Sequence, residues 1–440
     1  MADIIKDLGD GLILRRSRAG DAEPLAAFNK QIHAEDEWDG IGLEAWTRDL
    51  ISGKHPTFNV ADCTIVEDTN DHKIVSSMNL ISQTWTYEGI PFGVGRPELV
   101  GTLPAYRRRG LIGEQFSVVH QWSAERGELV QGITGIPYYY RRFGYEMAMN
   151  LGGGRIGYAP GVIPLKEGEK EPYSLREARE DDLPLIAELY KFGSQRSLVA
   201  AQWDMDLWRY ELSGKDRQNI DMRLLFIIED ENQHAVGFVA VPCIKWRTMT
   251  VITYYELKPG ASWFKITPSV VRWLWRFGEA QGAAQGQKQE AFGFWLGEEH
   301  PVYQAYDKYL PKIRESYAWF IRVPDLVKFL NVVTPALEAR LAESIVNGYT
   351  GLLKLSFYGT GIAMTFENGR ITGIQELVGD ALAKSSVEFP HLTFLQVLFG
   401  WRSLSEVRHL FPDCSWRNDE VKMLVDALFP RKASDVWPIS

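Results

Sequence analysis

Pro104-Ala105-Tyr106-Arg107-Arg108-Arg109-Gly110-Leu111-Ile112-Gly113 joins a predicted strand to a predicted helix. The apolar run at 98–103 before it is typical of a strand, and residues 114–122 after it have helical spacing. The first N–H groups of a helix have no partner inside the helix, and the helix dipole is positive there. Two glycines let the backbone approach a ligand closely, and three arginines supply forked donors. The stretch therefore predicts a polyphosphate site.

Two common phosphate-binding fingerprints do not fit this loop. No Gly-Lys-Ser/Thr follows it, which excludes a Walker A loop, and its glycines lack the G-x-G-x-x-G spacing. The loop instead resembles the acetyl-CoA pyrophosphate loop of the GNAT acetyltransferases, Arg/Gln-x-x-Gly-x-Gly/Ala, with Arg107 and Gly110 at its first and fourth positions. Ile112 stands where the general pattern has Gly or Ala. That variant resembles the enhanced-intracellular-survival (Eis) branch of the superfamily.

Length and composition indicate an ordinary globular chain of several domains. Its 440 residues predict two to four domains, and 45% of them are hydrophobic and 24% charged. The net charge of −9 argues against a general nucleic-acid or anionic-membrane surface. Cys63, Cys243 and Cys414 have no paired or metal-ligand spacing, so we expect free thiols and no metal. With no signal-peptide core and no membrane-length apolar run, we expect a cytoplasmic protein.

The first part of the chain has the element order of a GNAT domain. We expect a strand at 12–18, a helix that begins at the N-cap Asp21, and a second helix around 43–51. Strands at 63–67 and 74–81 form a hairpin, residues 85–88 come before a Gly-Ile-Pro turn, and a further strand leads into the arginine-rich loop. This order resembles the GNAT arrangement element for element.

The opening of this unit recurs once. Residues 14–21 can be laid beside residues 175–182, and each segment is followed by a leucine-rich helix. The second copy has its own hairpin at 224–229 and 236–241 and a strand at 251–257, but no arginine cluster or Gly-x-Gly turn follows that strand. We therefore expect a duplicated scaffold that has lost the phosphate site, since function resides in sites rather than in folds.

The last part of the chain predicts a third, smaller unit. Its expected elements are a helix at 336–345, strands at 351–358, 362–367 and 370–374 with an Asn368-Gly369 turn, and helices around 392–400 and 405–410. These elements resemble the sterol-carrier-like domain that closes Eis-type proteins. The whole chain is thus predicted to be α+β, with mixed sheets and flanking helices. We expect a catalytic GNAT domain at 1–160, a second GNAT-like domain at 161–331 and a sterol-carrier-like domain at 332–440. The family resemblance implies a homo-hexamer.

Acetyl transfer to an amine requires a fixed acyl donor, a neutral amine and a proton for the leaving thiolate. The resemblance implies acetyl-CoA as co-substrate, with its pantetheine arm along one strand and its pyrophosphate on the loop. The residues implied for this role are Val100, Gly101, Thr102, Arg107, Arg108, Arg109, Gly110, Leu111, Ile112 and Gly113.

The two proton-transfer roles are assigned through the same resemblance. The segment 140–145 resembles the family's Tyr-x-x-Phe-Gly-Tyr, which makes Tyr140 the acid that protonates the departing sulfur. A phenol suits this task because it stays protonated at neutral pH. In Eis-type enzymes the base is the C-terminal carboxylate, here that of Ser440. Packing alone is the alternative role for the tail, and Ser440 departs from the aromatic terminus of the family.

Candidate acceptor residues lie on the first unit. His33, Glu35, Asp36, Glu37 and Trp38 combine acids with an aromatic ring, which suits a polyamine or aminoglycoside cation. Trp85 on the adjacent hairpin is a further candidate. Cys63 has no His or Asn context, so direct attack in a ternary complex is expected rather than a cysteine-bound acyl group.

The resulting prediction is an N-acetyltransferase acting on a primary amine of a small molecule or a peptide. Two alternatives stay open: a non-catalytic protein that binds acyl-CoA or a lipid, and an acetyltransferase for protein lysines or peptide N-termini. The acceptor itself cannot be read from the sequence, because variable loops build acceptor pockets in this fold.

Overall fold

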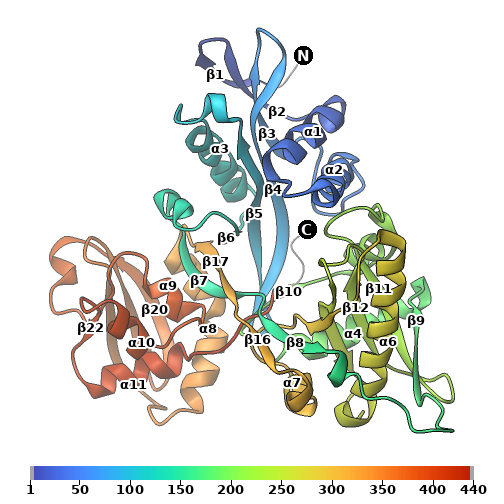
Figure 1. Cartoon of the computed structure of the whole chain (residues 1–440). Helices are drawn as coiled ribbons and strands as arrows, with labels where there is room; N and C mark the ends of the chain where they lie inside the picture. The colour runs from blue at the N-terminus through green and yellow to red at the C-terminus, as the bar shows by residue number, and fades with distance from the viewer. Residues whose placement is uncertain (1–3, 437–440) are drawn as a thin grey trace.

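The computed structural model describes residues 4–436, which form three lobes around a long central hairpin (Figure 1). The upper lobe holds the first unit. Its helices are α1 (Ala22–His33), α2 (Glu37–Ile51) and α3 (Leu111–Glu125). Its strands are β1 (Ile4–Gly9), β2 (Leu12–Arg16), β3 (Cys63–Asp68), β4 (Lys73–Tyr87), β5 (Ile90–Thr102), β6 (Val130–Ile133) and β7 (Glu146–Leu151).

The lower right lobe of Figure 1 holds the second unit. Its helices are α4 (Leu183–Ser194), α5 (Met205–Arg209), α6 (Trp263–Gln285) and α7 (Pro301–Ala305). The strands of this part of the chain are β8 (Gly154–Tyr158), β9 (Tyr173–Glu177), β10 (Val199–Gln202), β11 (Arg223–Asp230), β12 (Ala235–Pro242), β13 (Met249–Ile252), β14 (Tyr254–Leu257), β15 (Ala291–Phe294), β16 (Lys312–Arg314) and β17 (Tyr317–Arg322).

The lower left lobe holds the third unit, a five-stranded sheet with helices around it. Its strands are β18 (Gly351–Ser356), β19 (Gly361–Glu367), β20 (Arg370–Leu377), β21 (Val387–Glu388) and β22 (Ser415–Trp416). Its helices are α8 (Leu326–Ala342), α9 (Phe394–Leu398), α10 (Leu404–Leu410) and α11 (Asp419–Leu428). The predicted Asn368-Gly369 turn is present, with positive φ at both residues, as a two-residue hairpin of this type requires.

The central sheet carries the site described below. Its strand order is β1-β2-β3-β4-β5-β6-β17-β7, and β10 also pairs with β4. Side chains alternate across a strand, and neighbouring residues of β5 show this: Leu99 packs in the core with α1 and α2, and Val100 packs on the α3 side. One face of the sheet is thus covered by α1 and α2 and the other by α3 (Figure 1).

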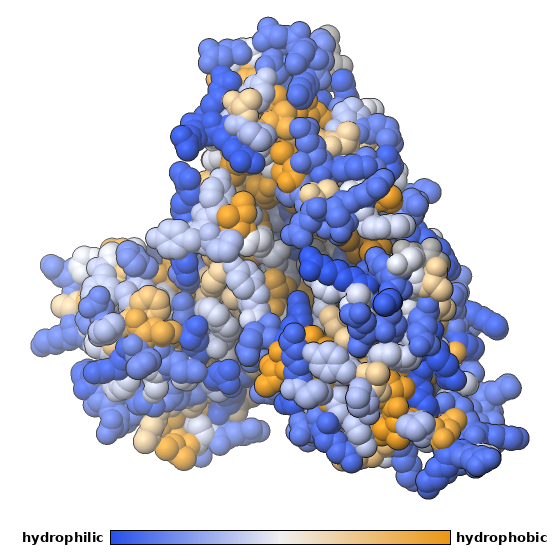
Figure 2. All heavy atoms as spheres, in the orientation of Figure 1, coloured by the Kyte–Doolittle hydropathy of each residue, from blue (hydrophilic) through white to orange (hydrophobic). Residues whose placement is uncertain are grey.

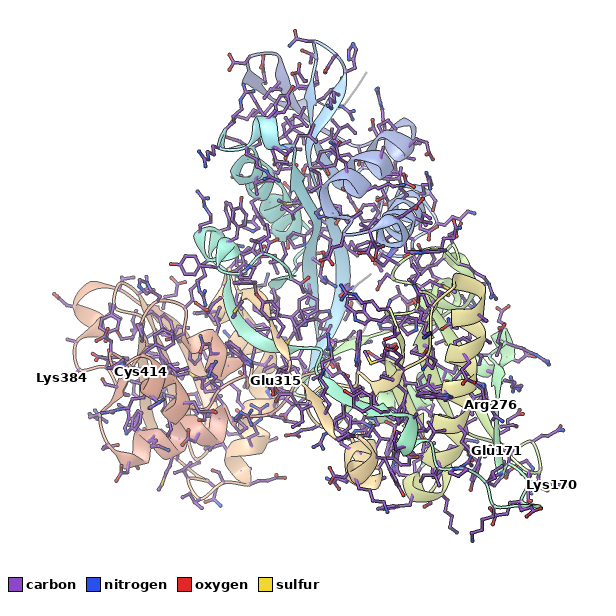
Figure 3. The ribbon with its side chains drawn as sticks, viewed as in Figure 1. Lys170, Glu171, Arg276, Glu315, Lys384 and Cys414 are labelled. Carbon is purple, nitrogen blue, oxygen red and sulfur yellow. The ribbon has the colours of Figure 1, made fainter. Side chains whose placement is uncertain are left out.

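The first two units exchange strands. The chain leaves the central sheet after β7 and enters the sheet of the second unit as β8, between β15 and β16. It returns after β16 and inserts β17 between β6 and β7, and Glu315 marks this crossing where the lobes meet (Figure 3). The 161–172 connection is held on α6 by Glu171, which pairs with Arg272 and Arg276 (Figure 3). The domain boundary at residue 160 stays a prediction. Strands from both sides of this boundary pair within the same sheets.

The mixed α+β class is confirmed, and the observed elements differ from the expected ones in two details. The expected boundary near 331 lies inside α8, which continues through Pro335. Phe329, Leu330, Val333 and Leu337 of this helix are fully buried, and that apolar stripe holds the helix together despite the missing N–H of the proline. The expected Gly-Ile-Pro turn is also shorter, because β4 and β5 pair up to Tyr87 and Ile90.

Candidate active site

A fork between two parallel strands opens the central sheet. β5 and β6 pair only at Val94 with Val130 and at Gly95 with Gln131, and the strands separate beyond that point. Further along β5, a register shift in the β4–β5 ladder between Glu98 and Gly101 and a positive φ at Leu99 (51°) mark a bulge. A cavity of about 1110 Å³ occupies the fork and extends to the N-terminus of α3. The outer surface is mostly hydrophilic and is hollowed where the lobes meet (Figure 2).

The cavity brings together all of the residues that the sequence predicted for donor binding. It is lined by Val100, Gly101, Thr102, Arg107, Arg108, Arg109, Gly110, Leu111, Ile112 and Gly113. His33 and Tyr140 line it as well, and Leu43 and Trp46 contribute from α2. The wall therefore contains residues from both faces of the sheet.

The arginine-rich loop ends at a helix N-terminus that is open to a ligand. Gly110 is the N-cap residue of α3, with φ 78° in the left-handed region, and no side chain caps this helix. A ligand can therefore take the place of a cap on the first N–H groups of α3. Arg109 donates to Asp10 at 3.0 Å, which fixes its guanidinium at the rim, and Arg108 has φ 65°. These features fit an anionic group such as a pyrophosphate.

Gly101 brings the backbone of β5 close to the end of α1. A Cβ at this position would lie 2.8 Å from Cγ2 of Ile32 and 3.4 Å from Nε2 of His33, so only glycine fits. Nε2 of His33 is buried and has no hydrogen-bond partner among the described residues. Burial lowers the pKa of His33, and the Leu99 backbone partly offsets this, so the ring is neutral at pH 7.

Tyr140 is held by other aromatic rings at the cavity wall. It belongs to the short helix η3 (Tyr139–Phe143), is 3% exposed, and meets Phe116 and Phe320 edge to face at 6.1 and 5.4 Å. Burial, and next the charge of Glu98, raise the pKa of its phenol, so it carries its proton at neutral pH. Tyr139 also lines the cavity, and Tyr138 is exposed outside it.

Glu98 is a cavity residue that sequence reasoning missed. It lies on β5 beside the Leu99 bulge, is 9% exposed and pairs with the buried guanidinium of Arg96. Burial raises the pKa of Glu98 to about 7, and Arg96 opposes that shift. An Arg-x-Glu pair inside an otherwise apolar strand was the available signal, because residues two apart lie on one face of a strand.

Most of the predicted acceptor residues lie elsewhere. Glu35, Asp36, Glu37 and Trp38 are exposed and are not part of the cavity wall. They follow His33 directly, and the Asp36 carboxylate caps α2 by accepting from the Asp39 N–H at 2.9 Å. The acidic run thus lies on the connection between α1 and α2.

Trp85 does not face a substrate. It is 0% exposed, meets Trp319 edge to face at 5.5 Å and donates its indole N–H to Gln83 at 2.8 Å. The extension of β4 through this residue buries the side chain that the sequence placed beside the acceptor. Ser440 lies outside the described residues, so its role as base stays a prediction.

Residues 4–436 contain neither a metal-binding cluster nor a membrane-spanning helix. No group of three or more His, Cys, Asp or Glu side chains there is arranged to hold a metal ion. None of the helices in this part of the chain has the length and apolar character to cross a membrane.

One family model matches part of the first unit. Residues 29–148 match the acetyltransferase (GNAT) domain, a span that runs from the end of α1 to β7 and includes the loop, Glu98 and Tyr140. A comparison with curated protein sequences returned no significant match. The domain match, with the fold it covers, supports an acyltransferase enzyme.

Solved structures share the fold over 73% to 97% of the chain. A protein of unknown function from Enterococcus faecalis V583, described as a probable N-acyltransferase, is 13% identical with a TM-score of 0.64, covering 96% of this chain and 97% of its own. Eis1 from Mycobacterium abscessus is also 13% identical, with a TM-score of 0.57, covering 97% and 99%. Saccharomyces cerevisiae N-myristoyltransferase with bound myristoyl-CoA is 12% identical, with a TM-score of 0.51, covering 73% and 81%. At these identities the likeness concerns the fold.

Proposed function

We propose that the protein is an acetyl-CoA-dependent N-acetyltransferase that transfers the acetyl group directly to a primary amine. One observation carries this proposal: a single cavity holds an uncapped helix N-terminus with arginines at one end and Glu98, His33 and Tyr140 deeper in the fork. An anion site joined to an acid and a base within one cavity suits a donor that has a polyphosphate and a thioester.

Positioning would come from the loop and from β5. Arg107 to Gly113 would bind the pyrophosphate through guanidinium and backbone donors. Val100, Gly101 and Thr102 would lie along the pantetheine arm, since the parting of β5 from β6 leaves backbone groups of β5 open to the cavity. Holding the thioester in place lowers the entropic part of the barrier.

The proton transfers would use groups from the two faces of the sheet. Glu98 would accept a proton from the acceptor amine, because its raised pKa matches a base that works near neutral pH. Tyr140 would donate its proton to the leaving thiolate. Neutral His33 lies across β5 from Tyr140 and would orient the amine with its unpartnered Nε2. Cys63 takes no part, since it is buried and burial raises its thiol pKa to about 12.

A variant that lacks residues 437–440 tests whether Glu98 or the Ser440 carboxylate is the general base. With Glu98 in this role, the shortened chain keeps its kcat/KM within about threefold. A loss on the scale of removing a general base, roughly 10²- to 10⁴-fold, would assign the role to the terminus.

The second unit would be a GNAT copy without a donor site. In both units an arginine near the start binds an aspartate six residues later and a glutamate on a neighbouring strand: Arg15 with Asp21 and Glu67, and Arg176 with Asp182 and Glu229. At the end of α4, beside Tyr254 and His300, the second unit has a cavity of only about 30 Å³. The C-terminal segment reaches this cavity through Asp435.

The remaining assignments rest on resemblance. The third unit would be sterol-carrier-like, and the protein would be a cytoplasmic hexamer. The acceptor would be an aminoglycoside, a polyamine or a lysine-like amine that enters on the α1–α2 side, where the acidic run at 35–38 follows His33. A peptide or protein amine is the other acceptor of the same chemistry.

Mass spectrometry of amines incubated with acetyl-CoA and the protein tests the function and identifies the acceptor. The panel contains an aminoglycoside, a polyamine, free amino acids and a lysine peptide. We expect one class to gain a single acetyl group on nitrogen. Binding of acetyl-CoA with no acetylated amine in any class would favour the binding-protein alternative.

A further inference from the structure

Three large side chains fill the space directly beneath the fork of β5 and β6. Trp85, Arg96 and Trp319, here named the floor cluster, are each 0% exposed. The guanidinium carbon of Arg96 lies 4.3 Å from the centre of the Trp319 ring, and the two indoles meet edge to face. A Cβ on Gly132 of β6 would lie 2.9 Å from Cη2 of Trp85, so the indole reaches the backbone of β6.

The floor cluster lies behind residues that line the cavity. Glu98 lines the cavity and pairs with Arg96 two residues earlier on the same strand. Ile133 lines the cavity from β6 and follows Gly132, the residue that contacts Trp85. Trp85, Arg96 and Trp319 do not line the cavity themselves, and they lie behind its wall at Glu98 and at the backbone of β6.

The opposite face of the sheet is filled at the same depth. Gln131 of β6 is 0% exposed, donates to Ser123 at 2.8 Å and accepts from Arg322 at 2.6 Å. This hydrogen-bonded network, together with the floor cluster on the other side, encloses the point where the two strands begin to pair. Both routes by which an extended chain could continue below the fork are occupied.

We propose that the floor cluster limits the acyl donor to short-chain CoA thioesters, an inference that rests on the proposed function. A thioester beside Glu98 and Tyr140 directs its acyl group toward the fork. A long chain would have to displace a packed indole or separate Arg96 from Glu98, and breaking a buried pair or overfilling a core is costly. The fold alone does not impose this limit, because a related fold holds myristoyl-CoA.

The test compares acetyl-, butyryl-, octanoyl- and myristoyl-CoA, both as ligands at equilibrium and as donors with one amine. For the wild type we expect kcat/KM to fall by about 100-fold or more from acetyl to octanoyl, the scale of steric exclusion from a packed site. Trp85→Ala should raise the octanoyl-to-acetyl ratio by roughly 10-fold or more, since it removes a packed indole behind the cavity wall and leaves space into which a longer acyl chain can extend. Trp208→Ala removes an equally buried indole in the second unit and should leave the ratio unchanged.

The outcomes separate this inference from the proposed function. Octanoyl-CoA bound and used within about threefold of acetyl-CoA by the wild type would overturn the length limit and leave the function standing. Failure of every thioester to bind would overturn both. If Trp85→Ala does not fold, Trp319→Phe shortens the same floor, and an unchanged chain-length profile in that variant counts against the floor cluster.

Discussion

Glu98 must be ionised before it can accept a proton from an amine. Burial raises its pKa from the ordinary range of a glutamate to about 7, so the basic form is lost as the pH falls through neutrality and gained as it rises. We expect kcat/KM to rise with pH and to show an inflection near 7. In Glu98→Gln this inflection should disappear, and activity should fall by about 10²- to 10⁴-fold, the usual range for a general base.

Glu128 supplies the matched control for that variant. It is a buried carboxylate of the same unit, 7% exposed, whose pKa is also raised by burial, but it is not part of the cavity wall. Glu128→Gln should therefore retain the pH profile of the wild type. A Glu98→Gln enzyme that keeps the inflection would remove Glu98 from the role of base.

At the scale of elements, the arginine-rich loop and the N-terminus of α3 should supply donor affinity rather than chemistry. Arg108 and Arg109 are exposed at the cavity wall, where each can donate to a phosphate. Arg108→Ala combined with Arg109→Ala should weaken CoA binding by about 10- to 100-fold, since hydrogen bonds to charged groups are worth about 1.5–3 kcal/mol each before solvent screening.

Calorimetric titration with CoA measures this effect. Arg18→Ala with Arg48→Ala removes the same charge from exposed positions outside the cavity and should leave the affinity unchanged. Equal CoA affinity in the loop variant and in this control would contradict the assignment of the loop.

Local sequence patterns predicted most of the helices and strands. The features that these patterns missed depend on contacts between residues that lie far apart in the sequence. The strand–loop–helix around Arg107 could be expected from apolar spacing and glycines, and so could the Asn368-Gly369 hairpin. The sequence assigned Trp85 to a substrate because nothing local shows that Trp319, from the exchanged strand β17, packs against it. Glu98 was missed for a related reason: its raised pKa depends on burial by elements distant in the chain. Pro335 suggested a boundary, but tertiary packing kept α8 continuous.

At the scale of the whole molecule, strand exchange should make the first two units fold together. β17 lies between β6 and β7 in the central sheet. A fragment of residues 1–160 therefore lacks the strand that joins β7 to the rest of the sheet. We expect this fragment to lack a cooperative thermal transition and to bind no CoA, and we expect co-expression with residues 161–440 to restore both. A fragment that melts cooperatively alone and binds CoA as the full chain does would contradict the interlocked arrangement.

The central claim is acetyl transfer within the cavity of the first unit. Its most direct test is amine-dependent release of the CoA thiol from acetyl-CoA, measured side by side for the wild type, Tyr140→Phe and Tyr139→Phe. We expect release by the wild type and Tyr139→Phe, and a loss of about 10- to 1000-fold in Tyr140→Phe with CoA binding retained, because only the buried phenol would protonate the thiolate. Binding of acetyl-CoA without amine-dependent release by the wild type, or equal release by both variants, would contradict the account.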